Sequence, residues 1–169
     1  MKQKVIIILL FSMICTIQSC KINYSFTGAS IPPEIKTISI HYIKNNASLV
    51  KPTLSQQLTE ALRNRFSSQT NLVPVNSVGD FDLSGEITNY YTSPTAIQGD
   101  QTAALNRLSI TINIRFVNKY DEKQNYEASF MRYADYPSSQ TLSSVENEIV
   151  EQIIEYLVDD VFNKTAVNW

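Results

Sequence analysis

The chain has 169 residues, of which 43% are hydrophobic and 18% are charged, with only four glycines and six prolines. This length and apolar share are typical of one globular domain, and they argue against a disordered chain or a two-domain enzyme with a separate cofactor module. The formal net charge of −2 argues against broad nucleic-acid binding, which depends on a surplus of Lys and Arg.

The first twenty residues have the pattern of an export signal. Lys2 and Lys4 precede an apolar run over residues 5–17, which is too short for a membrane-spanning helix and fits a signal peptide. The run ends in Ile17-Gln18-Ser19-Cys20, which resembles a bacterial lipobox. We therefore predict a lipoprotein signal peptide over residues 1–19 and an acylated, membrane-anchoring Cys20. The alternative is an ordinary signal peptide cut elsewhere, with Cys20 a free thiol.

The remaining cysteine, Cys15, lies inside the leader, so no disulfide, redox pair or thiolate metal site is expected in the mature chain. Residues 20–33 include Gly28 and the pair Pro32-Pro33, which favours an extended, lipid-anchored tether. A single domain is then expected over residues 34–169.

The first half of this domain alternates between strand and helix patterns. Residues 36–43 place Ile38, Ile40 and Tyr42 on one face, which predicts a half-buried strand. A helix is expected from Pro52 onward, with apolar residues at helical spacing: Leu54, Leu58, Ala61, Leu62 and Phe66. A second strand is expected over residues 80–91, with an inner face made of Phe81, Leu83, Ile87 and Tyr91. Inside it, Gly85 suggests a bulge or a close backbone approach.

The second half begins with residues 92–103, whose polar composition predicts a long loop of the kind that often carries function. The clearest strand follows: its apolar face is Leu108, Ile110, Ile112, Ile114 and Phe116, and its polar face is Arg107, Ser109, Thr111, Asn113 and Arg115. A turn over residues 119–125 leads to a strand at about 126–134. Ser143 or Ser144 is then expected to cap a last helix that buries Val145, Ile149, Ile153, Leu157 and Val161.

The predicted order is strand, helix, strand, strand, strand, helix. Strands that flank a helix are expected to be parallel, and the last three strands can form an antiparallel meander. Because each helix has one apolar stripe, we predict an α+β fold in which two helices pack on one face of a four-stranded mixed sheet.

Catalytic and cofactor signatures are not recognisable in the sequence. The single histidine, His41, has no cysteine partners, and neither a GxSxG elbow nor a glycine-rich phosphate loop occurs. We therefore expect no enzyme activity, no metal and no cofactor.

A set of basic residues lies on the last two predicted strands and the turn between them: Arg107, Arg115, Arg132 and Lys119. Arg107 and Arg115 are eight residues apart and therefore on one strand face. Guanidinium groups suit phosphates and carboxylates, so these four residues are candidate contacts for an anionic lipid headgroup. The alternative is a solvated sheet face whose charges provide solubility.

Several segments also resemble one known family. They are Tyr24-Ser25-Phe26-Thr27-Gly28-Ala29-Ser30-Ile31-Pro32-Pro33, Asn71-Leu72, Gly85-Glu86-Ile87-Thr88, Ala96-Ile97-Gln98-Gly99, Ala103-Ala104-Leu105-Asn106-Arg107-Leu108, Arg132-Tyr133-Ala134-Asp135-Tyr136 and Val161-Phe162-Asn163-Lys164. Over nearly the whole mature chain, these strings resemble the Bacteroidetes branch of the LptE family of lipopolysaccharide-assembly lipoproteins.

The resemblance implies a non-enzymatic lipoprotein on the periplasmic side of the outer membrane, with two helices on a four-stranded sheet. It also implies lipopolysaccharide as ligand and a large LptD-type β-barrel as partner, with the lipoprotein seated inside the barrel as a plug. The lipid-contacting residues of the enterobacterial branch cannot be aligned with Arg107, Arg115 or Arg132, so these stay candidates from strand geometry.

Two other functions stay open from the residues. A periplasmic lipoprotein that scaffolds another envelope or secretion channel would share the leader and would self-associate into rings. A hydrolase with an unusual site would depend on His41.

Overall fold

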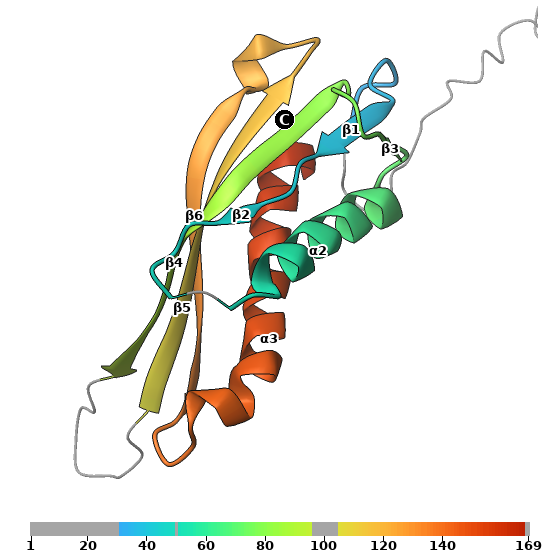
Figure 1. Cartoon of the computed structure of the whole chain (residues 1–169). Helices are drawn as coiled ribbons and strands as arrows, with labels where there is room; N and C mark the ends of the chain where they lie inside the picture. Colours follow the sequence, from blue (N-terminus) through green and yellow to red (C-terminus); the bar gives the residue numbers. More distant parts are fainter. Residues whose placement is uncertain (1–30, 50, 96–104, 168–169) are drawn as a thin grey trace, which may run out of the picture.

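The computed structural model describes residues 31–49, 51–95 and 105–167. In chain order its elements are β1 (Thr37–Ile40), β2 (Lys44–Asn45), α2 (Leu54–Gln69), β3 (Val73–Pro74), β4 (Phe81–Thr95), β5 (Leu105–Asn118), the short helix η1 (Glu122–Gln124), β6 (Tyr126–Pro137), α3 (Leu142–Phe162) and the π-helical turn η2 (Asn163–Val167). Both helices lie on one face of a mixed sheet (Figure 1), which confirms the predicted α+β two-layer architecture.

The sheet has the strand order β3-β1-β4-β5-β6, and β2 also pairs with β4. β1 is parallel to β4, as predicted for strands on either side of a helix. β4, β5 and β6 form the predicted antiparallel meander. The described sheet has six strands rather than four because two-residue strands, β2 and β3, flank α2. A two-residue strand is too short to show an alternating pattern in the sequence.

The core lies between the sheet and the two helices. α2 buries the predicted stripe of Leu54, Leu58, Leu62 and Phe66, and α3 buries Ile149, Ile153, Leu157 and Val161. The apolar face of β5 is fully covered by them. Aromatic rings join the layers: Phe66 meets Phe162 with ring centroids 5.2 Å apart, and Phe81 meets Phe116 edge-on at 4.9 Å. Burial of each such large side chain contributes about 1.5–3 kcal/mol, so the two stripes account for the packing of both helices on one face.

The predicted first strand ends early. β1 stops at Ile40, and the chain then turns so that Ile43 is buried while Tyr42 is 55% exposed. The reason is a side-chain hydrogen bond: the backbone N–H of Ile43 donates to Oγ1 of Thr59 on α2, at 3.0 Å. The expectation that Tyr42 faces the core was therefore wrong, because the alternation does not continue past Ile40.

A β-bulge in β4 changes the face of every later residue of that strand. The register shifts between Ile87 and Asn89, so Thr88 has no single partner on β5. Tyr90 consequently faces the core, and Tyr91 lies on the other face, where it is 43% exposed. The predicted inward position of Tyr91 was wrong for this reason.

Gly85 makes the close backbone approach that the sequence suggested. A Cβ atom at this position would lie closer than 3.0 Å to the Asn113 carbonyl oxygen and 2.8 Å from Cδ1 of Ile114, both on β5. Only glycine lets the two strands pair this tightly here, so the glycine in the strand pattern marks a close approach of the β4 and β5 backbones. The β-bulge lies three residues later, at Thr88.

The strand and helix ends differ slightly from the expected ones. β4 continues through Thr95 and β5 starts at Leu105, so residues 92–95 are strand rather than loop; residues 96–103 of the predicted loop lie outside the described residues. β6 runs on to Pro137. Thr141, rather than Ser143 or Ser144, occupies the N-cap position of α3, and its backbone carbonyl accepts a hydrogen bond from the Ser144 hydroxyl.

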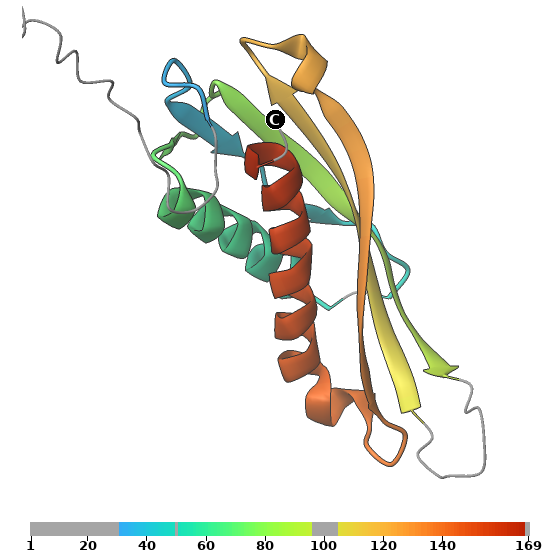
Figure 2. The ribbon, with the colours of Figure 1, turned by 180° about the vertical axis from the view of Figure 1, so that it is seen from behind.

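The long strands give the molecule two distinct ends. The C-terminal end of β4 and the N-terminal end of β5 lie at one end, while β1, β3 and η1 lie at the other, beside the C-terminal end of α3 (Figures 1 and 2). Among the helices within the described ranges, none has the length and apolarity needed to cross a membrane.

Candidate functional site

The sheet face opposite the helices is formed mainly by the long strands β4, β5 and β6, and we call it the outer face. Its residues follow from the register of β4, β5 and β6. They are Asp82, Ser84, Glu86, Asn89 and Tyr91 on β4; Arg107, Ser109, Thr111, Asn113 and Arg115 on β5; and Glu127, Ser129, Met131, Tyr133 and Asp135 on β6. The predicted polar strip of β5 therefore forms the centre of this face.

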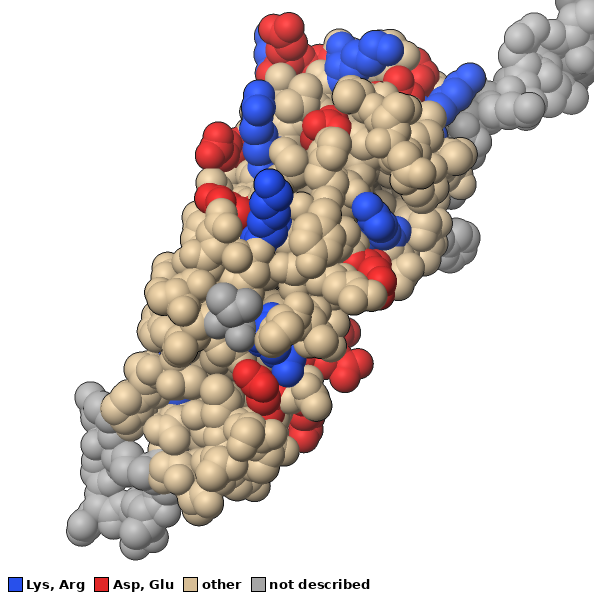
Figure 3. Space-filling model, in the orientation of Figure 1, with Lys and Arg blue, Asp and Glu red and all other residues tan. Residues whose placement is uncertain are grey.

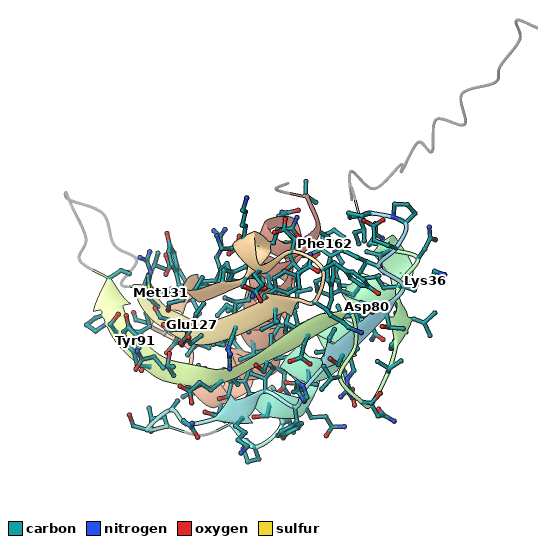
Figure 4. The ribbon with its side chains drawn as sticks, turned by 90° about the horizontal axis from the view of Figure 1, so that it is seen from above. Lys36, Asp80, Tyr91, Glu127, Met131 and Phe162 are labelled. Atoms are coloured by element: carbon teal, nitrogen blue, oxygen red, sulfur yellow. The ribbon has the colours of Figure 1, made fainter. Side chains whose placement is uncertain are left out.

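Charged groups are unevenly distributed over the surface of the molecule. In Figure 3, side chains of both signs are interspersed over the upper part, near β1 and η1, while the lowest part is almost free of them. Figure 4 shows Tyr91 and Met131 on one side of the view and Lys36 and Asp80 on the other. By the strand register, the outer face has a charged half toward β1, with Asp82, Glu86, Arg115 and Glu127, and a more aromatic half toward the end of β4, with Tyr91, Met131 and Tyr133.

The aromatic half is built around one cross-strand row. Ser109 pairs with Tyr91 on one side and Tyr133 on the other, and both rings leave it only 3% exposed. Tyr133 and Met131 are themselves 46% and 56% exposed. We call Tyr91, Met131 and Tyr133 the tyrosine patch. Such a patch offers apolar contact area together with hydroxyl groups, which suits a wet protein interface.

Arg107 lies in the aromatic half of the outer face and already forms an ion pair with Asp135. Its Nε and Nη2 donate to the two carboxylate oxygens of Asp135 at 2.7 and 2.9 Å, and its guanidinium carbon lies 3.6 Å from the centre of the Tyr133 ring. This hydrogen-bonded pairing holds the pKa of the Asp135 carboxyl below its ordinary value. Arg107 is therefore a fixed, charge-compensated group on the face, and any other anion must compete with Asp135.

Arg115 lies in the charged half and is not compensated in this way. It is exposed, and within the described ranges it forms no ion pair. Together with Lys44 and Asn113 it lines a hollow of about 210 Å³. Glu86 and Glu127 line the same hollow, but their carboxylates accept hydrogen bonds from the side-chain amides of Asn46 and Asn113. The hollow thus holds two cations and two carboxylates, and neither cation forms an ion pair with another described residue.

The two other predicted basic residues lie elsewhere. Arg132 pairs with Ile110, which places it on the helix side of the sheet, where it donates to both carboxylate oxygens of Asp160 on α3 at 2.6 and 2.5 Å. Lys119 follows β5 at the end of the molecule near β1 and helps to lower the pKa of Asp80, although backbone hydrogen bonding is the largest cause there. The four candidates therefore do not form one basic cluster.

His41 contributes no recognisable catalytic arrangement. Its Nε2 lies 2.8 Å from Oδ1 of Asp82, and the hydroxyl of Ser39 hydrogen-bonds to the same carboxylate oxygen. Ser39 is only 2% exposed. A serine nucleophile needs the imidazole, rather than the carboxylate, as its hydrogen-bond partner. This arrangement instead joins β1 to β4. Within the described ranges, no group of three or more His, Cys, Asp or Glu residues is placed to hold a metal ion.

Sequence reasoning missed Tyr91, Tyr133, Asp135 and Lys44. Tyr91 was assigned to the core because the bulge at Thr88 could not be anticipated. The phase of β6 did carry a usable signal: Tyr126, Ala128, Phe130, Ala134 and Tyr136 alternate as an apolar face, and Arg132 falls within that phase. That alternation separates Arg132 from Arg107 and places Tyr133 and Asp135 beside Arg107. The predicted lipidation site Cys20 lies outside the described residues.

Comparison with known proteins places this fold in a family. The LptE family, described as lipopolysaccharide-assembly, matches residues 35–165. A comparison with curated protein sequences finds no match.

Among solved structures, the hypothetical protein CT253 from Chlamydia trachomatis has a similar fold, with a TM-score of 0.53 at 9% identity; the match covers 79% of this chain and 99% of that chain. The protein XCC0632 from Xanthomonas campestris gives a TM-score of 0.52 at 13% identity, with 82% and 90% covered. At these identities the likeness concerns the fold alone. The family match, in contrast, spans nearly all of the described domain, and the chain belongs to the LptE family of lipopolysaccharide-assembly lipoproteins.

Proposed function

We propose that this protein is an outer-membrane lipoprotein, anchored through acylated Cys20 on the periplasmic side, whose outer face docks inside an LptD-type β-barrel and contacts lipopolysaccharide there. The observation that carries the proposal is the family match over residues 35–165. Residues 1–19 act as the signal peptide, residues 20–33 as the tether, and residues 34–169 as the single domain that reaches the barrel. The protein has no catalytic step in this account and needs no cofactor.

The character of the outer face supports docking in a barrel. The interior of a large membrane barrel is polar, so a plug that docks there can present a polar surface. On the outer face, Arg107 is paired with Asp135 and Glu127 is hydrogen-bonded by Asn113. The tyrosine patch adds the exposed apolar area that packs against a wall. A dry, obligate interface would instead need more large apolar side chains than this face carries.

Lipopolysaccharide carries phosphate and carboxylate groups, and Arg115 with Lys44 is the pair best placed to meet them. Both line one hollow, and neither is neutralised by an ion pair with another described residue. Arg107 becomes available only if Asp135 releases it, and Arg132 is held by Asp160 in the same way. Of the four candidates from the sequence, we therefore assign the phosphate contact to Arg115, with Lys44 added from the structure.

The docking claim is tested by a matched pair of variants in the full-length lipoprotein. Thr111→Arg adds a long cation at the centre of the outer face, and Gln152→Arg adds the same cation to the exposed surface of α3. After extraction of the outer membrane, the wild type and Gln152→Arg should co-purify with the barrel, while Thr111→Arg should recover much less. Equal recovery with both variants would mean that the outer face does not dock, and failure of the wild type to recover any barrel would refute the proposed partner.

The lipid contact is tested with purified protein and the phosphorylated glycolipid core of lipopolysaccharide. Arg115→Glu should weaken binding about tenfold, because one charge-assisted contact is lost and a repulsive one is introduced. Lys123→Glu on η1 changes the net charge equally and should bind as the wild type does. The double variant Arg107→Glu/Arg115→Glu should bind little more weakly than Arg115→Glu alone. If Arg115→Glu and Lys123→Glu bind alike while both stay folded, the assignment to Arg115 is wrong.

A further inference from the structure

A second surface lies at the free edge of the sheet. A groove of about 450 Å³ is lined by four consecutive β6 residues, 129–132, and by Asp160, Asn163 and Lys164 from the end of α3 and η2. This groove runs along the free edge of β6 and reaches the helix side of the sheet, and its lining shares Ser129 and Met131 with the outer face. The main-chain edge that forms it plays no part in the function proposed above.

Residues 129–132 form one wall of the groove through the main-chain edge of β6. Side chains alternate between the two faces along a strand, so four successive residues can line one concavity only through the edge that they share. β6 is the last strand in the sheet order, and among the described ranges no strand pairs with its far side. Every second N–H and C=O of such an edge points outward and can accept an added strand.

The side chains around this edge give the groove a chemical preference. Phe130 is partly buried and packs against the core, and Met131 is exposed, so apolar contact area lies beside the backbone. Arg132 and Asp160 neutralise each other at one side. The Lys164 ammonium lies 5.0 Å from the centre of the Tyr126 ring and has no carboxylate partner among the described residues. The Lys164 ammonium is therefore the positive charge beside the groove that has no acidic partner among the described residues.

We propose that an extended segment of a partner polypeptide adds to the sheet along β6, with an apolar side chain beside Phe130 and an acidic side chain beside Lys164. Main-chain hydrogen bonds to the strand edge contribute the affinity, and the two side chains of the segment determine the specificity. Tyr126, which Lys164 covers, and Phe130 are four residues apart on the same face of β6. The segment should therefore carry its apolar and acidic residues four positions apart, with β-forming residues between them.

A second copy of this chain fits the edge poorly. Two copies of β6 paired antiparallel about Met131 would place Glu127 of each opposite Asp135 of the other, so two like-charge pairs would form. The inward-pointing charge of Arg132 also matches the way in which edge strands avoid uncontrolled sheet pairing. A partner segment with its own complementary acidic residue avoids both difficulties.

The test uses a tethered probe on the full-length lipoprotein in detergent. The heptapeptide Thr-Leu-Thr-Val-Thr-Asp-Thr is fused after Trp169 through a flexible Gly/Ser linker, because the C-terminal end of α3 borders the groove and a tether raises the local peptide concentration to about millimolar. Two control fusions carry Lys in place of Asp, or Pro in place of the second and third Thr. The readout is hydrogen exchange of those backbone amides of residues 126–132 whose N–H groups point away from β5.

The acidic fusion should slow exchange of these β6 amides about tenfold relative to the Lys fusion, and the Pro fusion should give no slowing, since it cannot form the ladder. Lys164→Glu in the acidic fusion should abolish the slowing, and the matched variant Lys123→Glu should leave it intact. Equal exchange in all three fusions would overturn the proposal. So would full protection of these outward-pointing amides without any fusion, because the edge would then be occupied by this chain itself or by a second copy.

Discussion

Replacing Gly85 with alanine tests the tight pairing of β4 and β5 beneath the outer face. The added Cβ would lie within 3.0 Å of a main-chain oxygen of β5, and main chain cannot rotate away as a side-chain tip can. The strands would have to separate by several tenths of an ångström to about 1 Å, which lengthens ladder hydrogen bonds in the middle of a close-packed sheet.

Overpacking of this kind costs about 1–3 kcal/mol, and the backbone contact places Gly85→Ala in the upper part of that range, near 2–3 kcal/mol. At about 2–4 °C per kcal/mol for a domain of roughly this size, the melting temperature should fall by roughly 4–12 °C. Ser84→Ala, on the neighbouring outer-face position, is the matched control and should change the melting temperature by less than about 2 °C.

Thermal unfolding followed by circular dichroism measures both variants. If Gly85→Ala melts within about 2 °C of the wild type, the close approach of β4 to β5 does not constrain the fold.

Two further substitutions test polar contacts that join the layers and strands. Asp80 accepts hydrogen bonds from the backbone N–H groups of Lys36 and Thr37, which lowers its pKa, so its contribution to stability is present above about pH 4 and is lost as the pH falls through the lowered value. Asp80→Asn should therefore be less stable than the wild type at pH 7 in urea unfolding, with a difference that shrinks below pH 4; a difference that grows in acid would contradict this. Tyr90 donates to Glu146 on α3, so Tyr90→Phe should lose about 1–2 kcal/mol in the same assay, whereas an equal loss for exposed Tyr120→Phe would remove the support for that contact.

The periodic parts of the fold could be read from the sequence, and the irregular parts could not. The apolar stripes of α2 and α3 and the alternation along β5 are governed by local geometry, so they predict burial directly. The position of Tyr91 depends on the bulge at Thr88, which removes one residue from the pairing without any glycine to mark it. The turn after Ile40 depends on Thr59, which is distant in sequence.

The candidate site was predictable in outline only. The polar strip of β5 follows from its own alternation, but the partners of that strip depend on register between strands far apart in the chain. Arg107 meets Asp135 because β5 and β6 pair in one particular register, and Arg132 faces Asp160 for the same reason. A count of basic residues on neighbouring strands therefore overstated the unpaired positive charge, because Arg107 and Arg132 each form an ion pair with an aspartate.

The most direct test of the central proposal is site-specific photo-crosslinking of the full-length lipoprotein in intact outer membranes. A photoreactive residue placed at Thr111 on the outer face should crosslink to the β-barrel of the lipopolysaccharide-assembly machinery, whereas the same residue at Gln152 on α3 should crosslink far less. A crosslink to the barrel from Gln152 and none from Thr111, with both proteins lipidated and folded, would contradict the account.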